Sequence, residues 1–165
     1  HLPDLKLLNG VMPQLLDRYP NVEFAWAGMS EMPFPAHERM RMVPGVPLEE
    51  YPDLLGEFHI GLAPVVDTVF NESKSDLKYL EYTRRGIPVV ASRAPCYERS
   101  IAHGVNGFLA SNAKDWLKYL SRLIQDVELR RDIGAKGMDF ARARMISGNV
   151  WLWEEAYGLA KGTTG

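Results

Sequence analysis

Short apolar runs alternate with longer amphipathic segments along this chain, and no other feature constrains its fold as strongly. The apolar runs have the length of buried strands, and the segments between them carry apolar residues at helical spacing. Parallel strands need crossover connections of this length, so the alternation predicts an α/β fold, a Rossmann-like parallel sheet with helices on both faces. The predicted strands are residues 22–28, 41–43, 60–66, 88–92 and 107–110, the predicted helices are residues 4–19, 47–58, 74–86, 97–102, 113–125, 127–144 and 149–160, and the main predicted loops are residues 29–39 and 67–73.

Composition places the chain among ordinary globular proteins. Hydrophobic residues make up 46% and charged residues 24% of its 165 residues, values typical of a folded domain and not of a disordered, collagenous or coiled-coil chain. No internal repeat or linker divides the sequence, so we expect residues 1–165 to form a single domain. The longest apolar runs are far shorter than the roughly 20 residues of a membrane helix, which predicts no membrane insertion.

Charge and residue spacing limit the partners and cofactors. The formal net charge of −2 gives no bulk electrostatic reason to expect a nucleic-acid partner. The single cysteine, Cys96, excludes an internal disulfide, and the four histidines lack metal-motif spacing, so no metal site is expected. The sequence has no G-x-G-x-x-G segment and no P-loop motif. Dinucleotide binding and P-loop phosphate binding therefore have no support from motifs.

The most informative loop leads into the helix predicted at residues 74–86, at the carboxyl edge of the sheet, where open parallel sheets bind ligands. Lys74, Lys78, Glu81 and Arg85 share one side of that helix. Its first turn would offer free backbone N–H groups and two ammonium groups to a diphosphate, and Glu81 could accept hydrogen bonds from a pair of sugar hydroxyls. The same spacing fits ordinary surface pairs of Lys78 with Glu81 and of Glu81 with Arg85, and it leaves both interpretations open.

Longer motifs resemble the C-terminal half of the group 1 (family 4) glycosyltransferases. Residues 80–92 read L-E-Y-T-R-R-G-I-P-V-V-A-S, and residues 103–109 read H-G-V-N-G-F-L. Residues 126–134 match the D-x-x-L-R-x-x-x-G pattern, and residues 19–24, Y-P-N-V-E-F, are similar to the family's strand pattern. The resemblance covers roughly residues 1–145.

This resemblance implies the GT-B architecture, in which two Rossmann-like domains enclose a cleft, and it implies that this chain is the donor-binding half. We therefore expect a fragment of a larger protein, whose partners are a nucleotide-sugar donor and a missing N-terminal acceptor domain. The terminal helix, within residues 149–165, is expected to pack on that other domain; packing into the core of this one is an equal alternative.

The implied function is to bind a nucleotide-diphosphate sugar for transfer to a polysaccharide, lipid-linked sugar or protein. The implied reaction is retaining and metal-independent, without a cofactor, and the isolated domain is expected to be inactive. The resemblance further implies a bacterial enzyme of polysaccharide biosynthesis, cytoplasmic and peripheral at the inner membrane in the full-length protein.

The resemblance also suggests which residues contact the donor, while the catalytic residues stay unassigned. Glu81 occupies the position that binds the ribose hydroxyls, and Ser73 stands where the family has an acidic residue near the donor sugar. The remaining candidates are Asn71, Lys74, Ser75 and Lys78 at the diphosphate, Gly28, Val43 and Pro44 near the nucleobase, and Glu98 in a later loop.

Two alternatives remain open at this point. One is a sugar-nucleotide epimerase of the same architecture. The other is a non-catalytic α/β interaction module with a degenerate donor site, which Ser73 favours because it replaces a carboxylate that the family uses.

Overall fold

A computed structural model describes residues 2–28 and 35–158 of the chain, and it confirms the α/β prediction. Every strand pairing in it is parallel. The strands are β1 (Phe24–Ala27), β2 (Met40–Val43), β3 (Gly61–Ala63), β4 (Val89–Ser92) and β5 (Phe108–Ala110). All five fall on predicted strands and are mostly shorter than predicted.

The strands form two hydrogen-bonded groups. One group is the pair β1-β2, and the other has the order β3-β4-β5. In the second group Leu62 pairs with Val90, and Val90 pairs with Phe108, so the apolar centres of the three strands are in register.

The helices keep the predicted order, with three changes in the first half. They are α1 (Leu2–Lys6), α2 (Met12–Arg18), α3 (Tyr51–Leu55), α4 (Val69–Glu72), α5 (Leu77–Thr83), α6 (Pro95–Glu98), α7 (Ala113–Gln125), α8 (Val127–Ala143) and α9 (Ile146–Ala156). The single helix predicted over residues 4–19 is wrong, because Gly10 disfavours helix and Pro13 suits only a helical first turn, where α2 begins. The predicted loop 67–73 contains α4, which Thr68 caps by accepting a hydrogen bond from the Asn71 N–H.

The third change concerns the helix predicted at residues 74–86. α5 begins only at Leu77, so Lys74 and Ser75 precede it. Its end is closer to the prediction: Gly86, with a φ of +71°, follows the last turn in a left-handed conformation that favours glycine.

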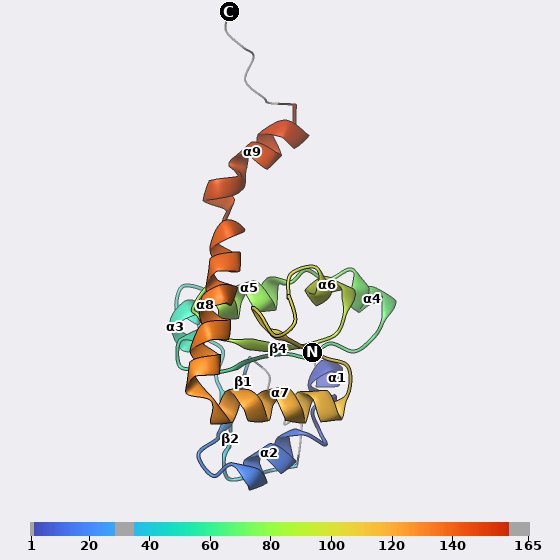
Figure 1. Cartoon of the computed structure of the whole chain (residues 1–165), viewed down its shortest axis with the longest axis vertical. Helices are drawn as coiled ribbons and strands as arrows, with labels where there is room; N and C mark the ends of the chain where they lie inside the picture. Colours follow the sequence, from blue (N-terminus) through green and yellow to red (C-terminus); the bar gives the residue numbers. More distant parts are fainter. Residues whose placement is uncertain (1, 29–34, 159–165) are drawn as a thin grey trace, which may run out of the picture.

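Helices cover both faces of the β3-β4-β5 group (Figure 1). α7 packs on β4 and β5 from one side, and α5 packs on β3 and β4 from the other. α8 contacts both α5 and α7, and two of its glycines permit a close approach to α5 and to the turn that follows it. A Cβ at Gly134 would lie 2.0 Å from the Gly86 carbonyl oxygen, and one at Gly137 would lie 2.7 Å from Thr83 Cγ2.

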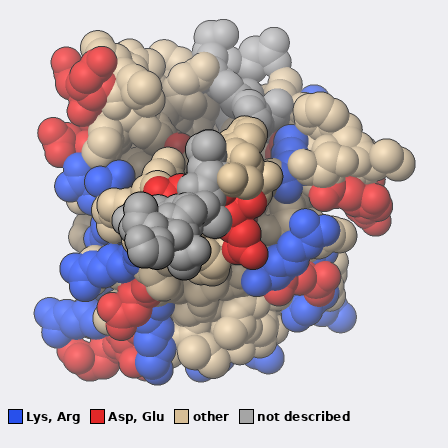
Figure 2. Space-filling view, turned by 90° about the horizontal axis from the view of Figure 1, so that it is seen from above, with Lys and Arg blue, Asp and Glu red and all other residues tan. Residues whose placement is uncertain are grey.

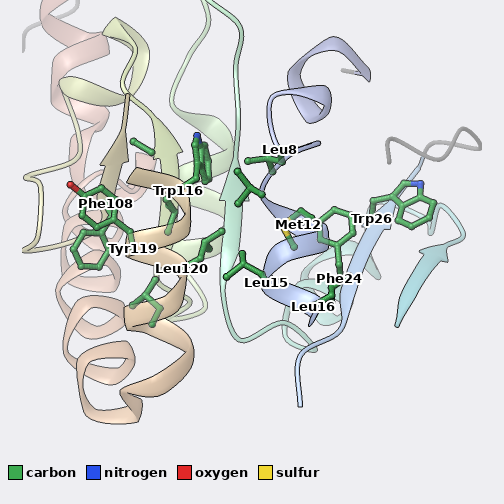
Figure 3. Close-up of a cluster of buried hydrophobic side chains, with 14 of the residues drawn as sticks. Leu8, Met12, Leu15, Leu16, Phe24, Trp26, Phe108, Trp116, Tyr119 and Leu120 are labelled. Carbon is green, nitrogen blue, oxygen red and sulfur yellow. The ribbon is translucent and has the colours of Figure 1, made fainter. Parts of the chain in front are cut away.

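The larger apolar core joins the two strand groups. Side chains from α2 and β1, including Leu15 and Phe24, face side chains from β5 and α7, including Phe108 and Leu120 (Figure 3). The Phe108 and Tyr119 rings stack with their centroids 4.9 Å apart. The two groups are therefore held together by side-chain packing, not by a shared hydrogen-bond ladder.

α9 extends away from this body toward the C-terminal end (Figure 1). It has no buried residue, and more than half of the Trp151 and Trp153 surfaces is exposed. The alternative that the final helix packs into the core of this domain is therefore wrong. Residues 29–34 of one predicted loop, and residues 159–165, lie outside the described residues.

Candidate functional site

A cavity of about 830 Å³ opens between the two strand groups. Its lining includes Gly28, at the carboxyl end of β1, and Pro64, just after β3. Asp4, Tyr51 and Lys78 also line it. The cavity therefore reaches the edge of the sheet at which a parallel α/β fold binds ligands.

Asp4 is the most highly connected residue at this edge. Its side chain is 7% exposed, and Oδ1 accepts hydrogen bonds from the Val66 N–H at 2.9 Å and from Asn71 Nδ2 at 3.3 Å. Its Oδ2 accepts from Lys74 Nζ at 3.4 Å. Asn71 also donates to the Val66 carbonyl at 2.7 Å. One buried carboxylate thus fixes the loop between β3 and α5 to the first helix.

The two predicted cations differ in their surroundings. Lys74 forms an ion pair with Asp4 and also lies over the Phe70 ring, 5.4 Å from its centroid. Lys78, four residues further along the chain, lines the cavity and is half-buried. Burial lowers the pKa of Lys78, and the nearby Asp4 carboxylate opposes that shift. An anion in the cavity would stabilise the charged form of Lys78.

Glu81 is held by a residue from a different helix. Tyr51 Oη, on α3, donates to Glu81 Oε2 at 3.3 Å. Burial raises the pKa of Glu81, while the Tyr51 hydrogen bond and the Lys78 charge oppose that shift. Burial also raises the pKa of Tyr51, so its hydroxyl stays protonated and can keep donating. The Glu81 carboxylate is oriented toward α3 by this contact.

The start of α5 differs from the predicted anion site. Because the helix begins at Leu77, Lys74 is not on it, and the buried Asp76 occupies its N-cap position. The Asp76 carboxylate accepts a hydrogen bond from the Ser100 hydroxyl and lies 3.5 Å from Arg144. A carboxylate therefore stands at the start of this helix, and the placement of a diphosphate near its first turn stays a prediction.

The surface pairs that the spacing allowed, Lys78 with Glu81 and Glu81 with Arg85, are replaced in the structure by contacts with α3. Arg85 pairs with Asp53 at 3.0 Å, and Glu81 accepts its hydrogen bond from Tyr51. The side of α5 that carries Lys78 and Glu81 therefore faces α3 and the cavity, not only solvent.

The remaining predicted residues divide into those at the cavity and those outside it. Gly28 has a φ of +76°, and its N–H donates to the carbonyl of Val43, which is buried at the end of β2. Pro44, Ser73 and Ser75 are exposed and do not line the cavity. Glu98 is exposed and pairs with Arg93 at 3.1 Å, which gives it a partner on its own loop.

The sequence reasoning did not identify Asp4 and Tyr51. Asp4 carried a signal, because it lies four residues before Leu8 and eight before Met12 on what becomes a buried face. A carboxylate on a buried apolar face needs hydrogen-bond or ionic partners, so this position of Asp4 could have indicated a structural role. Tyr51 carried no such signal, since its contact with Glu81 spans 30 residues.

Two features are absent from the part of the chain that the structure describes. No group of three or more His, Cys, Asp or Glu side chains suited to a metal ion occurs in residues 2–28 and 35–158. None of the helices described there is long and apolar enough to cross a membrane. On the face shown in Figure 2, basic and acidic side chains are intermixed, without a single basic patch.

Comparison with known proteins identifies one family. A family model described as glycosyl transferases group 1 matches residues 4–126. No curated protein sequence matches the chain.

Solved structures share the fold at low sequence identity. HepE from Anabaena, solved with UDP and glucose, has 19% identity and a TM-score of 0.62, over 73% of this chain and 32% of its own. TarM from S. aureus, solved with UDP among its ligands, has 15% identity and a TM-score of 0.72, over 95% of this chain and 33% of its own. The C-terminal domain of LpcC from Francisella tularensis has 16% identity and a TM-score of 0.62, over 85% of this chain and 76% of that domain. This chain spans about a third of the length of HepE and TarM.

Proposed function

This chain belongs to the group 1 glycosyltransferases, and we propose that it is the domain of such an enzyme that binds the nucleotide-diphosphate sugar donor. The observation that carries the proposal is the cavity between the two strand groups, which reaches the carboxyl ends of the strands and there brings together Gly28 and Lys78. Glu81 lies beside it, held by Tyr51. HepE was solved with UDP and glucose, which supports the same ligand class here.

In this proposal each residue has a separate task. The half-buried ammonium of Lys78 pairs with the diphosphate, because a desolvated cation gains most from an anion partner. Glu81 accepts hydrogen bonds from the ribose hydroxyls. Gly28, in its left-handed conformation, allows the ligand to approach the backbone at the end of β1.

The chemistry proposed for the complete enzyme is glycosyl transfer. The bond between the anomeric carbon of the sugar and the diphosphate oxygen breaks, and the diphosphate leaves with that electron pair. An acceptor hydroxyl forms the new bond to the anomeric carbon and loses its proton. Cationic groups at the diphosphate stabilise the negative charge that develops there. We further propose retention of configuration, no metal ion, and an acceptor bound by a separate N-terminal domain, with the isolated chain inactive. The acceptor in this proposal is a polysaccharide, a lipid-linked sugar or a protein. The complete enzyme in this proposal is bacterial and cytoplasmic, and it lies at the inner membrane.

Calorimetry with UDP, GDP, ADP and their sugars tests donor binding. We expect one nucleotide to bind, and Lys78→Ala to weaken that binding at least fivefold, about 1 kcal/mol. Lys136→Ala is the matched control, because Lys136 is exposed on α8 and pairs with Asp132 at 2.7 Å. Equal affinity in the wild type and Lys78→Ala would contradict the assignment of Lys78.

The interaction-module alternative keeps one observation in its favour. Ser73 is exposed outside the cavity and supplies no carboxylate to a donor sugar. If no nucleotide binds at millimolar concentration, this alternative replaces the donor-domain proposal. A sugar-nucleotide epimerase would instead bind the nucleotide sugar and change its configuration without an acceptor.

A further inference from the structure

A second cavity, of about 310 Å³, lies at the edge of the β3-β4-β5 group opposite the proposed donor contacts. Phe58 and His59, which precede β3, line it, and so do Gly86 and Pro88, which precede β4. Because β3 and β4 are parallel, both segments lie at the amino ends of the strands. Ligands of the carboxyl edge are therefore bound on the other side of the sheet.

The second cavity adjoins the first but has a lining of its own. Phe58, His59 and Arg130 line both spaces, and all three lie at the amino edge or at the start of α8. Arg85 and Arg131 line only the second cavity. A ligand of the second cavity would thus meet residues that the proposed donor does not use.

The lining of this cavity is strongly basic. Three guanidinium groups line it, those of Arg85, Arg130 and Arg131, and His59 lies beside them. Among the described residues, no Asp or Glu lines it. Arginine stays charged throughout the physiological pH range. Three like charges around one small space repel one another, and an anion between them would replace that repulsion with attraction.

Two of the arginines have partners that are exposed to water. Arg85 Nη2 donates to Asp53 Oδ1 at 3.0 Å. Arg131 Nη1 donates to Glu128 Oε1 at 2.7 Å. The two carboxylate side chains are 85% and 79% exposed, and neither lines the cavity. Such exposed pairs stabilise weakly, and a guanidinium has five N–H donors, so both arginines keep donors for an anion.

Arg130 is held more firmly. Its Nη1 donates to the carbonyls of Leu123 and Ile124, at 2.6 and 3.0 Å, near the end of α7. These bonds use one nitrogen and fix the guanidinium group at the cavity wall. A cation that is already held in place loses little freedom when an anion binds, which favours binding.

The rest of the wall is apolar and open. Ile87 and Pro88 are buried, and Phe58 is half-buried. Nothing lies within 4 Å of a Cβ added at Gly86, so the wall is not blocked at the turn. The volume is at the lower end of the range for small-molecule sites. The cavity thus combines charge for an anionic group with a surface for a small carbon body.

We propose that this cavity binds the phosphate monoester of a small molecule, with the three arginines at the phosphate and the apolar wall against the carbon body. A phosphate monoester carries about −1.5 to −2 charges and three acceptor oxygens, so it matches three guanidinium groups better than a carboxylate does. Arginine also forms bidentate pairs with phosphate. The proposal does not depend on whether the domain binds a nucleotide sugar, because the two sites use different residues.

Amide NMR of residues 1–165 during a titration with phenyl phosphate, at constant ionic strength, tests the site. We expect the amide signals of His59, Gly86 and Ile87 to shift and to reach saturation. The amide of Gly28 reports on the donor edge. Shifts confined to Gly28 and its neighbours would place the phosphate at the donor edge and would overturn the proposal.

Arginine variants test which groups hold the phosphate. Arg85→Gln and Arg131→Gln should each weaken binding about threefold to tenfold, because each removes one charged donor. Arg142→Gln is the matched control: Arg142 is also on α8, its side chain is 63% exposed, and it lies 3.8 Å from Asp139, outside the cavity lining. The same affinity in all three variants as in the wild type would overturn the site.

The choice of anion tests the chemical class of the ligand. Phenyl phosphate should bind about tenfold more tightly than benzoate, because a carboxylate has less charge and fewer acceptor oxygens. It should also bind about threefold more tightly than inorganic phosphate, because its ring contacts the apolar wall. Equal affinity for phenyl phosphate and benzoate would overturn the assignment of a phosphate. Equal affinity for phenyl phosphate and inorganic phosphate would overturn the assignment of the carbon body.

Discussion

Asp4 and Lys74 form an ion pair 3.4 Å long between the first helix and the loop that follows β3. The same carboxylate accepts hydrogen bonds from the Val66 backbone and the Asn71 amide. Asn71 and Lys74 were predicted to meet a ligand directly, yet both are engaged by a residue of this domain. These contacts hold the loop that precedes α5, and ligand contact by Asn71 and Lys74 stays a prediction.

Asp4→Ala should destabilise the fold by about 2–4 kcal/mol, because it leaves buried donors and an ammonium without their acceptor. Urea unfolding of the wild type and the variant measures this free energy. Asp132→Ala is the control, since Asp132 pairs with Lys136 on the exposed side of α8 and should change stability by less than about 0.5 kcal/mol. Equal losses in the two variants would show that the Asp4 contacts contribute no more than a surface pair.

Glu81 predicts a pH dependence of stability. Burial raises its pKa above the ordinary value of 4.5, so the folded state binds this proton more tightly than the unfolded state does. That contribution is present below the unfolded pKa and is lost as the pH rises through the folded pKa. The wild type should therefore lose stability relative to Glu81→Gln as the pH rises from about 4 through the folded pKa. A stability difference between the two proteins that does not vary with pH would contradict burial as the cause.

Tyr51→Phe should raise the pKa of Glu81 further, because the lost hydrogen bond favours the charged carboxylate. Carbon NMR of the Glu81 carboxyl measures this shift. If Glu81 binds ribose, the variant should also bind the preferred nucleotide about threefold to tenfold more weakly, about 0.5–1.5 kcal/mol. Tyr157→Phe is the control, because Tyr157 is 69% exposed on the segment after α9. An unchanged Glu81 pKa would show that the Tyr51 hydroxyl does not control this carboxyl.

Gly134→Ala should destabilise the fold by about 2–3 kcal/mol or more, because the new Cβ would overlap backbone atoms of Gly86, which cannot rotate away. Gly148→Ala is the matched control within α9: nothing lies within 4 Å of its added Cβ, and alanine favours helix over glycine by about 0.5–1 kcal/mol. Thermal unfolding of both variants separates the two effects. A stable Gly134→Ala protein would mean that α8 can move away from α5 without cost.

The sequence predicted features that depend on local periodicity. The five strands, the long helices after residue 112 and the stop at Gly86 follow from spacing and from the conformational freedom of glycine. The break between α1 and α2 also had a local signal, in Gly10 and Pro13, but the apolar spacing concealed it.

The site was harder to predict, because its contacts join distant residues. The Asp4–Lys74 contact spans 70 residues, and the Tyr51–Glu81 contact joins two helices from different parts of the chain. Asp76 could not be distinguished from a surface acid until Ser100 and Arg144 were placed beside it. No periodicity encodes such pairings.

The exposed aromatic row on α9 has a consequence for the chain in solution. Trp151, Trp153 and Tyr157 leave more than half of their surfaces in water, and the Trp153 and Tyr157 rings stack on each other 6.0 Å apart. Exposed apolar area of this kind attracts other copies of the same surface. The colloidal stability of residues 1–165 should therefore depend more on this helix than on the nearly balanced charge of the chain. The attraction between molecules should grow as the solution is warmed.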